Sequence, residues 1–165
     1  MNPAPEAEDE YTYNQICEKL TSLNIKYGLL IHAPVRTSEE AAAIRGVSLD
    51  GGAKAMLFKD SKSGTFYLAV MSATKRVSWK LVKNNLKVKK LELANEEEVK
   101  KITRCLPGAV PPFGSAFGVK TLLDPSLIKQ GDSINFNVGL RTHSMNLKVE
   151  DYLKAENPEI VEFVE

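Results

Sequence analysis

Two strand-like runs joined by a short polar turn constrain the fold most strongly. The runs are AKAMLFKD over residues 53–60 and TFYLAVM over residues 65–71, and SKSG separates them. Apolar, aromatic and β-branched residues dominate both runs, and Gly64 lies in the turn. This pattern predicts a β-hairpin, so at least part of the sheet is antiparallel.

Helical patterns alternate with strand patterns along the chain. Apolar residues between positions 13 and 23 recur at helical spacing. In RTSEEAAAIRGV, Thr37 and Glu40 match a capping box, Arg45 suits the last turn and Gly46 the C′ position. Further helices are predicted over SWKLVKNN, NEEEVKKITRC and EDYLKAEN, a buried strand over IKYGLLIHA, and other strands over VKKLELA, GVKTLLDPSLI, SINFNVG and SMNLKVE. This order predicts an α+β fold.

Length and composition predict one soluble domain. Residues 1–10, MNPAPEAEDE, are rich in proline, alanine and acids, which is typical of a disordered tail. Residues 11–165 contain no visible repeat or linker and are expected to form a single domain. No run of 18 apolar residues and no basic-then-apolar start is present, so we expect neither a membrane span nor a signal peptide. Two cysteines in all predict a reducing compartment, the cytoplasm.

Metal, cofactor and nucleophile chemistry find little support. The chain has two histidines, His32 and His143, and two cysteines, too few for a disulfide framework or a four-ligand zinc site. It lacks the phosphate-binding, dinucleotide-binding, zinc-protease and nucleophile-elbow motifs. A pair of Cys105 with His32 or His143 is formally possible, but a buried thiol and an isolated histidine are the commoner arrangement. We expect no metal and no cofactor.

The stretch LPGAVPPFG, residues 106–114, is apolar although it contains three prolines and two glycines. The prolines fix φ and Gly108 frees it, which predicts a rigid turn that presents the N–H of Gly108 and its neighbours. Such donors can hold a carbonyl or a developing oxyanion. The simpler alternative is a turn that packs on the core through Phe113 and Phe117.

Lys54 is a second candidate for a functional site, beside the 106–114 stretch. Lys54 lies in GGAKAMLF, after a double glycine and at the head of an apolar strand. Strand heads beside glycine turns often line clefts, and a lysine there can bring a cation to a phosphate or a polarised carbonyl. The alternative is a lysine that extends from the sheet edge into solvent.

Five blocks, taken together, resemble a known family. HAPVRTSEEAAAIRG, GAKAMLFK, PGAVPPFG, LLDPSLI and FNVGLRTHSMNLKVEDYL occur in the order found in the YbaK/ProX aminoacyl-tRNA deacylases, which are related to the editing domain of bacterial prolyl-tRNA synthetase. The resemblance covers about residues 12–165. It implies a mixed, barrel-like β-sheet with flanking helices. It also implies hydrolysis of the ester between a wrong amino acid and tRNA, without metal, cofactor or protein nucleophile.

The resemblance also implies a site. The family's lysine and its G-x-x-x-P element fall on Lys54 and on Gly108 to Pro112, so Lys54 and Gly108 are the candidate catalytic residues. The loop backbone would hold the terminal adenosine and the aminoacyl carbonyl, Lys54 would contact carbonyl or phosphate, and water would attack with help from a ribose hydroxyl. The candidate substrate-binding residues are His32, Ala109, Pro112, Phe113, Asn137, His143 and Ser144.

Several alternatives stay open. The Asn137 amide could bond a substrate hydroxyl or thiol, or satisfy backbone in a turn, and His143 and Ser144 could form an ordinary polar turn. The blocks most resemble the free-standing branch that clears seryl, threonyl and similar small groups. A non-catalytic module that docks on tRNA or a synthetase is the competing reading, but it needs neither Lys54 nor the Gly108 element. We expect aminoacyl-tRNA and possible synthetase partners, and a monomer or weak homodimer.

Two features of the sequence bear on tRNA binding: an arginine at a position where the family often has glycine, and a segment rich in basic residues. Family members often have Thr-Gly where this chain has Thr103-Arg104, and an arginine there could add a phosphate contact. Residues 61–91 carry eight bases and no acid, and Lys80 and Lys83 lie within this run. Lys80, Lys83 and Arg104 are therefore candidate tRNA-binding residues. The alternative for the run is a solvated helix face.

Overall fold

The computed structural model describes residues 7–165, which contain six α-helices, two short 3₁₀ segments and eight strands. The helices are α1 (Tyr11–Ser22), α2 (Ser38–Arg45), α3 (Trp79–Leu86), α4 (Glu96–Thr103), α5 (Pro125–Lys129) and α6 (Val149–Glu156), and the 3₁₀ segments are η1 (Leu49–Gly51) and η2 (Gly114–Phe117). The strands are β1 (Gly28–Ile31), β2 (Ala53–Asp60), β3 (Phe66–Ser72), β4 (Leu91–Leu93), β5 (Lys120–Leu123), β6 (Ser133–Asn137), β7 (His143–Lys148) and β8 (Glu159–Ile160).

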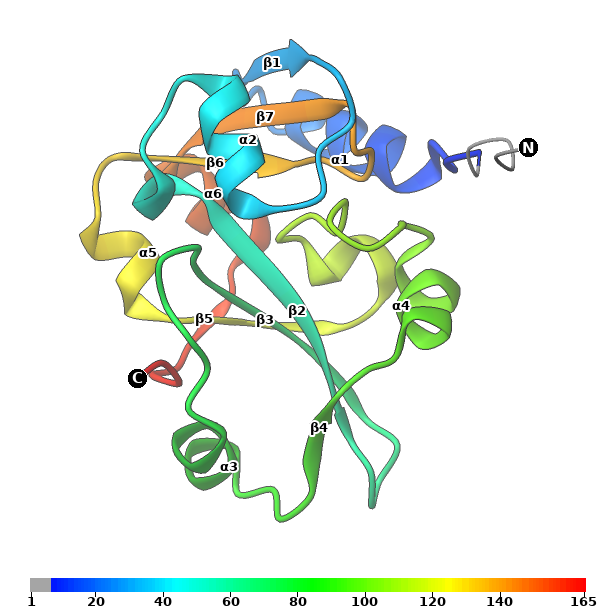
Figure 1. Cartoon of the computed structure of the whole chain (residues 1–165), viewed down its shortest axis with the longest axis vertical. Coiled ribbons are helices and arrows are strands. Elements are labelled where there is room, and N and C mark those ends of the chain that lie inside the picture. Colours follow the sequence, from blue (N-terminus) through cyan, green and yellow to red (C-terminus); the bar gives the residue numbers. More distant parts are fainter. Residues whose placement is uncertain (1–6) are drawn as a thin grey trace.

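The predicted hairpin is confirmed and forms the centre of a five-stranded sheet. Strands β2 and β3 pair antiparallel, and Lys54 lies opposite Met71. The strand order is β4-β2-β3-β5-β8, with β4 antiparallel to β2 and with β3, β5 and β8 mutually parallel. The sheet is therefore mixed, as expected. The hairpin extends away from the rest of the molecule toward α3 and β4 (Figure 1).

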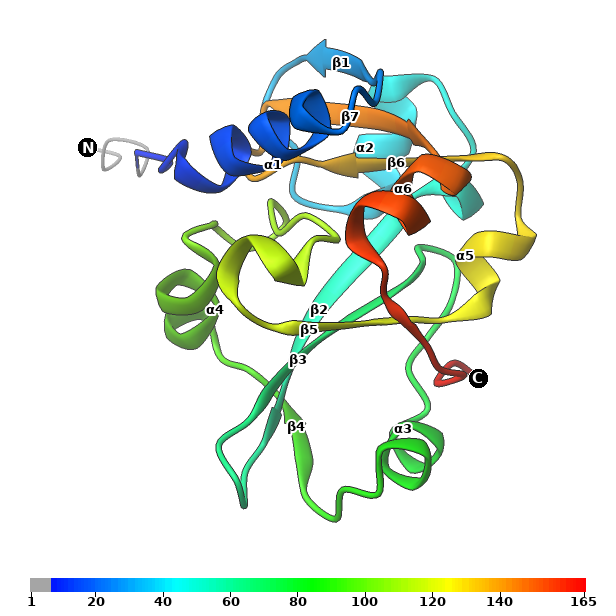
Figure 2. The same ribbon diagram turned by 180° about the vertical axis from the view of Figure 1, so that it is seen from behind.

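A second, three-stranded antiparallel sheet has the order β1-β7-β6. Helix α2 covers one face of it, and α1 and α6 cover the other (Figures 1 and 2). A single bridge between Gly52 and Asn135 links the two sheets. The α+β class is confirmed, but the expectation of a barrel-like sheet is wrong. Each sheet keeps its own edges, at β4 and β8 and at β1 and β6, because one bridge does not close a continuous ladder.

Local sequence signals account for most helix ends. The Thr37 hydroxyl accepts a hydrogen bond from the Glu40 N–H at 3.1 Å, and Gly46 ends α2 with φ +68°. The Glu40 carboxylate accepts from the Arg36 N–H instead of completing the capping box. Asn95 and Glu98 do complete a capping box at the start of α4.

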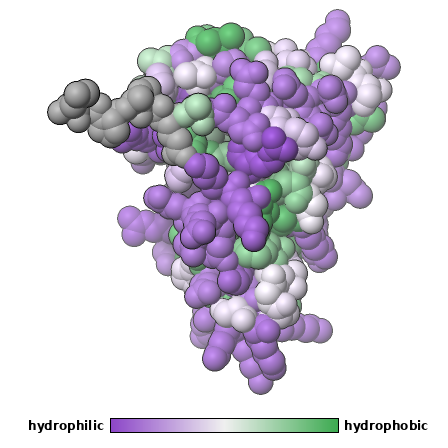
Figure 3. Space-filling model, turned by 90° about the vertical axis from the view of Figure 1, so that its right-hand side faces the viewer, coloured by the Kyte–Doolittle hydropathy of each residue, from purple (hydrophilic) through white to green (hydrophobic). Residues whose placement is uncertain are grey.

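Two strand predictions need correction. The strand over residues 28–31 forms, but all four residues are exposed, because it is the edge of the smaller sheet and its outer faces remain uncovered. Figure 3 shows hydrophobic surface at the top of the molecule, where β1 lies in Figure 1. The run GVKTLLDPSLI divides into β5 and α5. Asp124 caps the helix through the Ser126 N–H and Pro125 occupies its first turn, so the strand stops there.

The core lies between the smaller sheet, the hairpin and the helices that cover them. Its larger cluster includes Ile16 and Leu20 of α1, Phe136 of β6 and Tyr152 of α6. A second cluster packs α3 against the five-stranded sheet around Phe58, Val82 and Phe163. No helix within residues 7–165 is long and apolar enough to cross a membrane.

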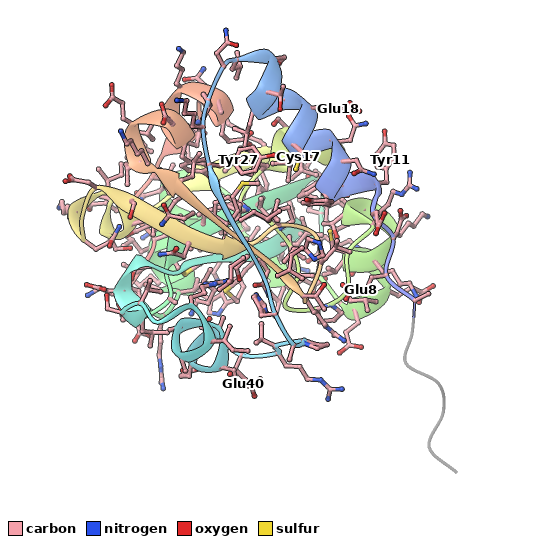
Figure 4. The ribbon with its side chains drawn as sticks, turned by 90° about the horizontal axis from the view of Figure 1, so that it is seen from above. Glu8, Tyr11, Cys17, Glu18, Tyr27 and Glu40 are labelled. Atoms are coloured by element: carbon pink, nitrogen blue, oxygen red, sulfur yellow. The ribbon has the colours of Figure 1, made fainter. Side chains whose placement is uncertain are left out.

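The N-terminal segment lies partly outside the described residues. The predicted disordered tail covers residues 1–10, of which 1–6 are not described. Glu8 accepts a hydrogen bond from the Arg141 N–H, and Asp9 forms an ion pair with Arg104 at 2.6 Å. Glu8 lies just ahead of α1, near Tyr11 at the helix start (Figure 4). The described part of the segment is thus bonded to the loops around the candidate site.

Candidate functional site

The 106–114 loop is held from several sides. Phe113 is fully buried, with its ring 5.7 Å from that of Phe136 and 5.3 Å from that of Tyr152. The Tyr152 hydroxyl donates to the carbonyl of Pro112 at 2.6 Å. The Ala109 carbonyl accepts from the Gly139 N–H at 2.9 Å. The loop is therefore a packed turn, as the simpler interpretation predicts, and this packing fixes the direction of its exposed part.

Gly108 is the exposed point of that loop. Its φ of +86° lies in the left-handed region, and a Cβ there would be 3.3 Å from the carbonyl oxygen of Arg36. Among residues 7–165 the N–H groups of Gly108 and Val110 have no hydrogen-bond acceptor, whereas the Ala109 N–H donates to Leu106. Two backbone donors thus remain available beside the loop, and both residues line a pocket.

That pocket lies between α2, the start of β2 and the 106–114 loop, and it has a cavity volume of about 100 Å³. Lys54, Gly108 and Asn137 line it together, although 83 positions separate the first from the last in the sequence. Arg36 and Arg45 add two further cations, and the lining contains no carboxylate. The lining residues are Arg36, Thr37, Ser38, Ala41, Arg45, Gly52, Ala53, Lys54, Ala55, Ala73, Gly108, Val110 and Asn137. A pocket of this charge favours ligands with anionic or acceptor oxygens.

Lys54 is held on one wall of the pocket. It is half-buried in the second position of β2, and its Nζ donates to the carbonyl of Lys75 at 2.7 Å. Burial lowers the pKa of Lys54, and Arg76 lowers it further, while Glu39 partly offsets both. The ammonium therefore lies next to the pocket with part of its hydration removed, which strengthens its interaction with an incoming oxygen.

A polar network forms the buried end of the pocket. Arg45 donates from Nε to the Ser144 hydroxyl at 2.7 Å and from Nη2 to the Asn137 amide oxygen at 2.8 Å. The Asn137 Nδ2 in turn donates to the Gly108 carbonyl at 2.9 Å. His32 Nε2 bonds the Ser144 hydroxyl at 2.7 Å. This network connects α2, β6 and β7 to the glycine of the loop.

The predicted substrate-binding residues separate into two groups. Asn137 lines the pocket, and Ser144 and His32 are bonded to it through the network. Ala109, Pro112 and Phe113 do not line it, because they are buried and anchor the loop. The sequence analysis expects the backbone of this loop to hold the substrate, so the substrate contacts of these three residues stay a prediction.

His143 also lies away from the pocket. Neighbouring residues of a strand point to opposite faces, so Ser144 faces α2 and His143 faces α1. The His143 ring is 5.0 Å from that of Tyr13, edge to face, and its Nδ1 bonds the Thr142 hydroxyl. His143 is not among the residues that line the pocket, and its predicted substrate contact stays a prediction.

Neither cysteine belongs to the site. Burial raises the pKa of Cys105 to about 11, so its thiol is protonated at neutral pH and is a poor nucleophile. Its Sγ donates to the Thr103 carbonyl. Cys17 of α1 lies beside Tyr27 (Figure 4), and hydrogen bonding with Cys17 together with burial raises the pKa of Tyr27 to about 12. No group of three metal-ligating side chains exists within residues 7–165.

The basic residues predicted to bind tRNA lie elsewhere. Lys80 and Lys83 are on α3, at the opposite end of the molecule from α2 (Figure 1). Arg104 follows α4 with φ +59°, a left-handed conformation that favours glycine. Its guanidinium pairs with Asp9 and lies 3.9 Å from the Tyr11 ring centroid. Arg104 thus anchors the N-terminal segment.

Sequence reasoning missed Arg45 as a pocket residue. It interpreted this arginine as a charge that complements the end of a helix. One signal was available: Ala41, Ala42 and Arg45 are spaced by three and four residues, so they share a helix face. Ala41 and Ala42 are buried, and a face that buries alanines directs the arginine inward as well.

Comparison with known proteins agrees with this arrangement. Residues 32–155 match the model of the aminoacyl-tRNA editing domain. The chain is 31% identical over 159 residues to the multifunctional Ser/Thr-tRNA deacylase ProXp-y of Escherichia coli (strain K12), with 95% of each chain covered. It is 32% identical over 99 residues to the prolyl-tRNA editing protein ProX of Acetoanaerobium sticklandii, with 60% of each covered.

The fold agrees as well. A solved structure described as a candidate trans-editing enzyme for prolyl-tRNA synthetase superposes with a TM-score of 0.78 at 21% identity, over 99% of both chains. The family model covers most of the chain, including Lys54, the 106–114 loop and the network around Arg45. This chain therefore belongs to the aminoacyl-tRNA editing domain family.

Proposed function

We propose that the protein is a trans-editing hydrolase that removes small amino acids of the serine, threonine and alanine type from mischarged tRNA. The observation that carries the proposal is the convergence of Lys54 and the free N–H groups beside Gly108 on one pocket without carboxylates. Membership of the editing-domain family supports hydrolysis of aminoacyl-tRNA, and the Ser/Thr-tRNA deacylase relative supports the substrate class.

The proposed reaction needs no protein nucleophile. A water molecule attacks the carbonyl carbon of the aminoacyl ester, and the carbonyl oxygen takes up negative charge. The N–H groups of Gly108 and Val110 and the Lys54 ammonium stabilise that charge. Collapse of the intermediate breaks the bond between the acyl carbon and the ribose oxygen. The proton lost by the water reaches that oxygen, assisted by the neighbouring ribose hydroxyl, and free amino acid and tRNA leave.

A panel of mischarged tRNAs tests the proposal. Purified protein is incubated with tRNAs that carry serine, threonine, alanine or a large aliphatic residue, and loss of the labelled amino acid is followed over time. The proposal is supported if tRNA loses serine, threonine or alanine faster with the protein than without it. Binding of tRNA without any hydrolysis would favour the docking-module alternative.

We expect the protein to act in the cytoplasm, where its substrate is, alone or with a synthetase, as a monomer or weak homodimer.

The basic segment around α3 gives a prediction about tRNA binding. Lys80 and Lys83 follow the loop that contains Lys75 and Arg76, and Lys54 bonds the Lys75 carbonyl, so the chain runs from a loop beside the pocket to α3. The lower part of the molecule is largely hydrophilic (Figure 3). Reversing both lysines of α3 to glutamate is expected to raise KM for aminoacyl-tRNA about 10-fold and to flatten its salt dependence, because phosphate contacts release counterions.

The matched control replaces Lys101 of α4 and Lys154 of α6 with glutamate. Both lysines are exposed, and their reversal changes the net charge by the same amount as reversal of Lys80 and Lys83. Hydrolysis of a minimal aminoacyl-adenosine is expected to stay near the wild-type rate in both variants, since that substrate does not reach α3. An unchanged KM and salt slope in the Lys80 and Lys83 variant would show that α3 is an ordinary solvated face.

Arg104 gives a contrasting prediction. Arg104→Gly removes the strain of a left-handed arginine, about 1 kcal/mol. It also removes the exposed ion pair with Asp9, which contributes little to the free energy of unfolding. We therefore expect a melting temperature within about 3 °C of the wild type, together with unchanged KM for aminoacyl-tRNA. A rise in KM similar to that of the α3 variant would return Arg104 to the tRNA-binding surface.

A further inference from the structure

Arg45 is a pocket cation without an anionic partner. Among residues 7–165 no carboxylate forms an ion pair with it, and its side-chain bonds go to two neutral groups, the Ser144 hydroxyl and the Asn137 amide oxygen. Burial lowers the pKa of Arg45 to about 10, so the guanidinium still carries its charge at neutral pH. A partly buried cation without a counter-charge is costly unless another group satisfies it.

The fixed geometry of Arg45 leaves hydrogen-bond donors for a ligand. A guanidinium has five N–H groups, and the two described bonds use one from Nε and one from Nη2. Ser144 and Asn137 are 3% and 8% exposed, so the guanidinium is held at the buried end of the pocket. Lys54, by contrast, is held on the wall beside the exposed Lys75. The two cations therefore occupy different depths of the pocket.

We propose that Arg45 is a specificity-determining residue that donates a hydrogen bond to the side-chain oxygen of the bound aminoacyl group. This inference rests on the proposed function. With the ester held between Lys54 and Gly108, the amino acid side chain points toward the buried end of the pocket. A seryl or threonyl hydroxyl there accepts a hydrogen bond from one of the guanidinium N–H groups of Arg45 that the network leaves free. An alanyl group leaves the guanidinium without that partner.

The Arg45 network also explains the orientation of Asn137. Because Nη2 of Arg45 donates to the amide oxygen, the amide nitrogen must face the Gly108 carbonyl, which accepts from it. Loss of Arg45 therefore lowers activity in two ways. The effect on the loop is shared by every substrate, whereas the effect on the hydroxyl is confined to seryl and threonyl groups. The ratio of kcat/KM for a seryl substrate to kcat/KM for an alanyl substrate therefore distinguishes the two effects.

The test compares seryl and alanyl groups carried on the same tRNA, which differ by one oxygen atom. We expect the wild type to have a higher kcat/KM for the seryl substrate. Arg45→Met is expected to lower the seryl-to-alanyl ratio of kcat/KM by about 10- to 100-fold, the effect of one hydrogen bond to a charged group. Arg45→Lys, which keeps the charge but not the forked geometry, is expected to recover part of the ratio.

Arg36→Met is the matched control, since Arg36 also lines the pocket and the charge change is the same. It is expected to keep the wild-type ratio. Binding of unreactive seryl- and alanyl-amide analogues of 3′-amino-3′-deoxyadenosine, measured by calorimetry, tests Arg45 even if no hydrolysis is found. A wild-type protein that binds both analogues equally or neither, or an Arg45→Met variant with an unchanged ratio, overturns the inference. The same drop in ratio in both arginine variants also overturns it, because charge alone would then suffice.

Discussion

Replacing Lys54 with alanine is expected to lower kcat/KM for deacylation by about 1,000-fold, the effect of removing one preorganised group that stabilises an oxyanion. Among the described residues, Lys54 is one of three cations that line the pocket; it lies at the head of β2, and its ammonium donates to the Lys75 carbonyl. Its stability effect should be small. Burial lowers the pKa of Lys54 in the folded state, so the charged side chain costs some free energy of folding. Lys54→Ala removes that cost and also removes one hydrogen bond, and the two effects offset each other.

Two variants and a pH profile sharpen this prediction. Lys59→Ala, in the same strand but paired with Glu98 away from the pocket, is expected to keep near-wild-type activity. The lowered pKa sets the sign of the pH dependence: catalysis that needs charged Lys54 is present at neutral pH and is lost as pH rises through a value below 10.5. Lys54→Arg should move that loss to higher pH. After subtraction of uncatalysed hydrolysis, near-wild-type turnover by Lys54→Ala would remove Lys54 from the mechanism.

Replacing Gly108 with alanine is expected to lower kcat/KM by about 100-fold, a loss comparable to that of one oxyanion-hole donor. The new Cβ would lie 3.3 Å from the Arg36 carbonyl oxygen, on a residue with φ +86°, so the loop must shift to accept it. That shift moves the free N–H groups and the carbonyl bonded to Asn137. The conformational strain should reduce the free energy of unfolding by only about 1 kcal/mol.

The chain offers a matched control for this strain. Gly64 in the hairpin turn also has a positive φ, +76°, but nothing lies within 4 Å of its Cβ position. Gly64→Ala should reduce the free energy of unfolding by a similar amount and leave deacylation near the wild-type rate. Equal activity in the two alanine variants, measured with a thermal melt of each, would mean that the 106–114 loop is only a packed turn.

Much of the fold could be predicted from local sequence, because local interactions decide it. Thr37 and Gly46 mark the ends of α2, and Asn95 with Glu98 marks the start of α4, since caps act within one helical turn. The hairpin followed from its two apolar runs and from Gly64 in the turn. The end of β5 was missed although Asp124 and Pro125 are a local helix start, because the apolar run before them continued the strand pattern.

The candidate site was predicted only in part. Lys54 and Gly108 could be identified from the sequence, because each stands out locally, one as a cation after two glycines and the other as a free φ among prolines. The resemblance to the editing family then assigned them one reaction. The sequence could not show that the side chains of Phe113 and His143 lie away from the pocket, because burial and the choice of strand face depend on which elements cover each side of a sheet.

The sequence by itself determined five of the six α-helices within residues 7–165, the hairpin, the rigid loop and the family, since these depend on neighbouring residues and on motifs in order. Only the tertiary structure decided that the sheets stay separate and that Arg45 turns inward to bond Ser144 and Asn137. The reason is physical. Those bonds join residues 99 and 92 positions apart, and whether a charge at a helix end meets water or a pocket depends on the sheet packed against that helix.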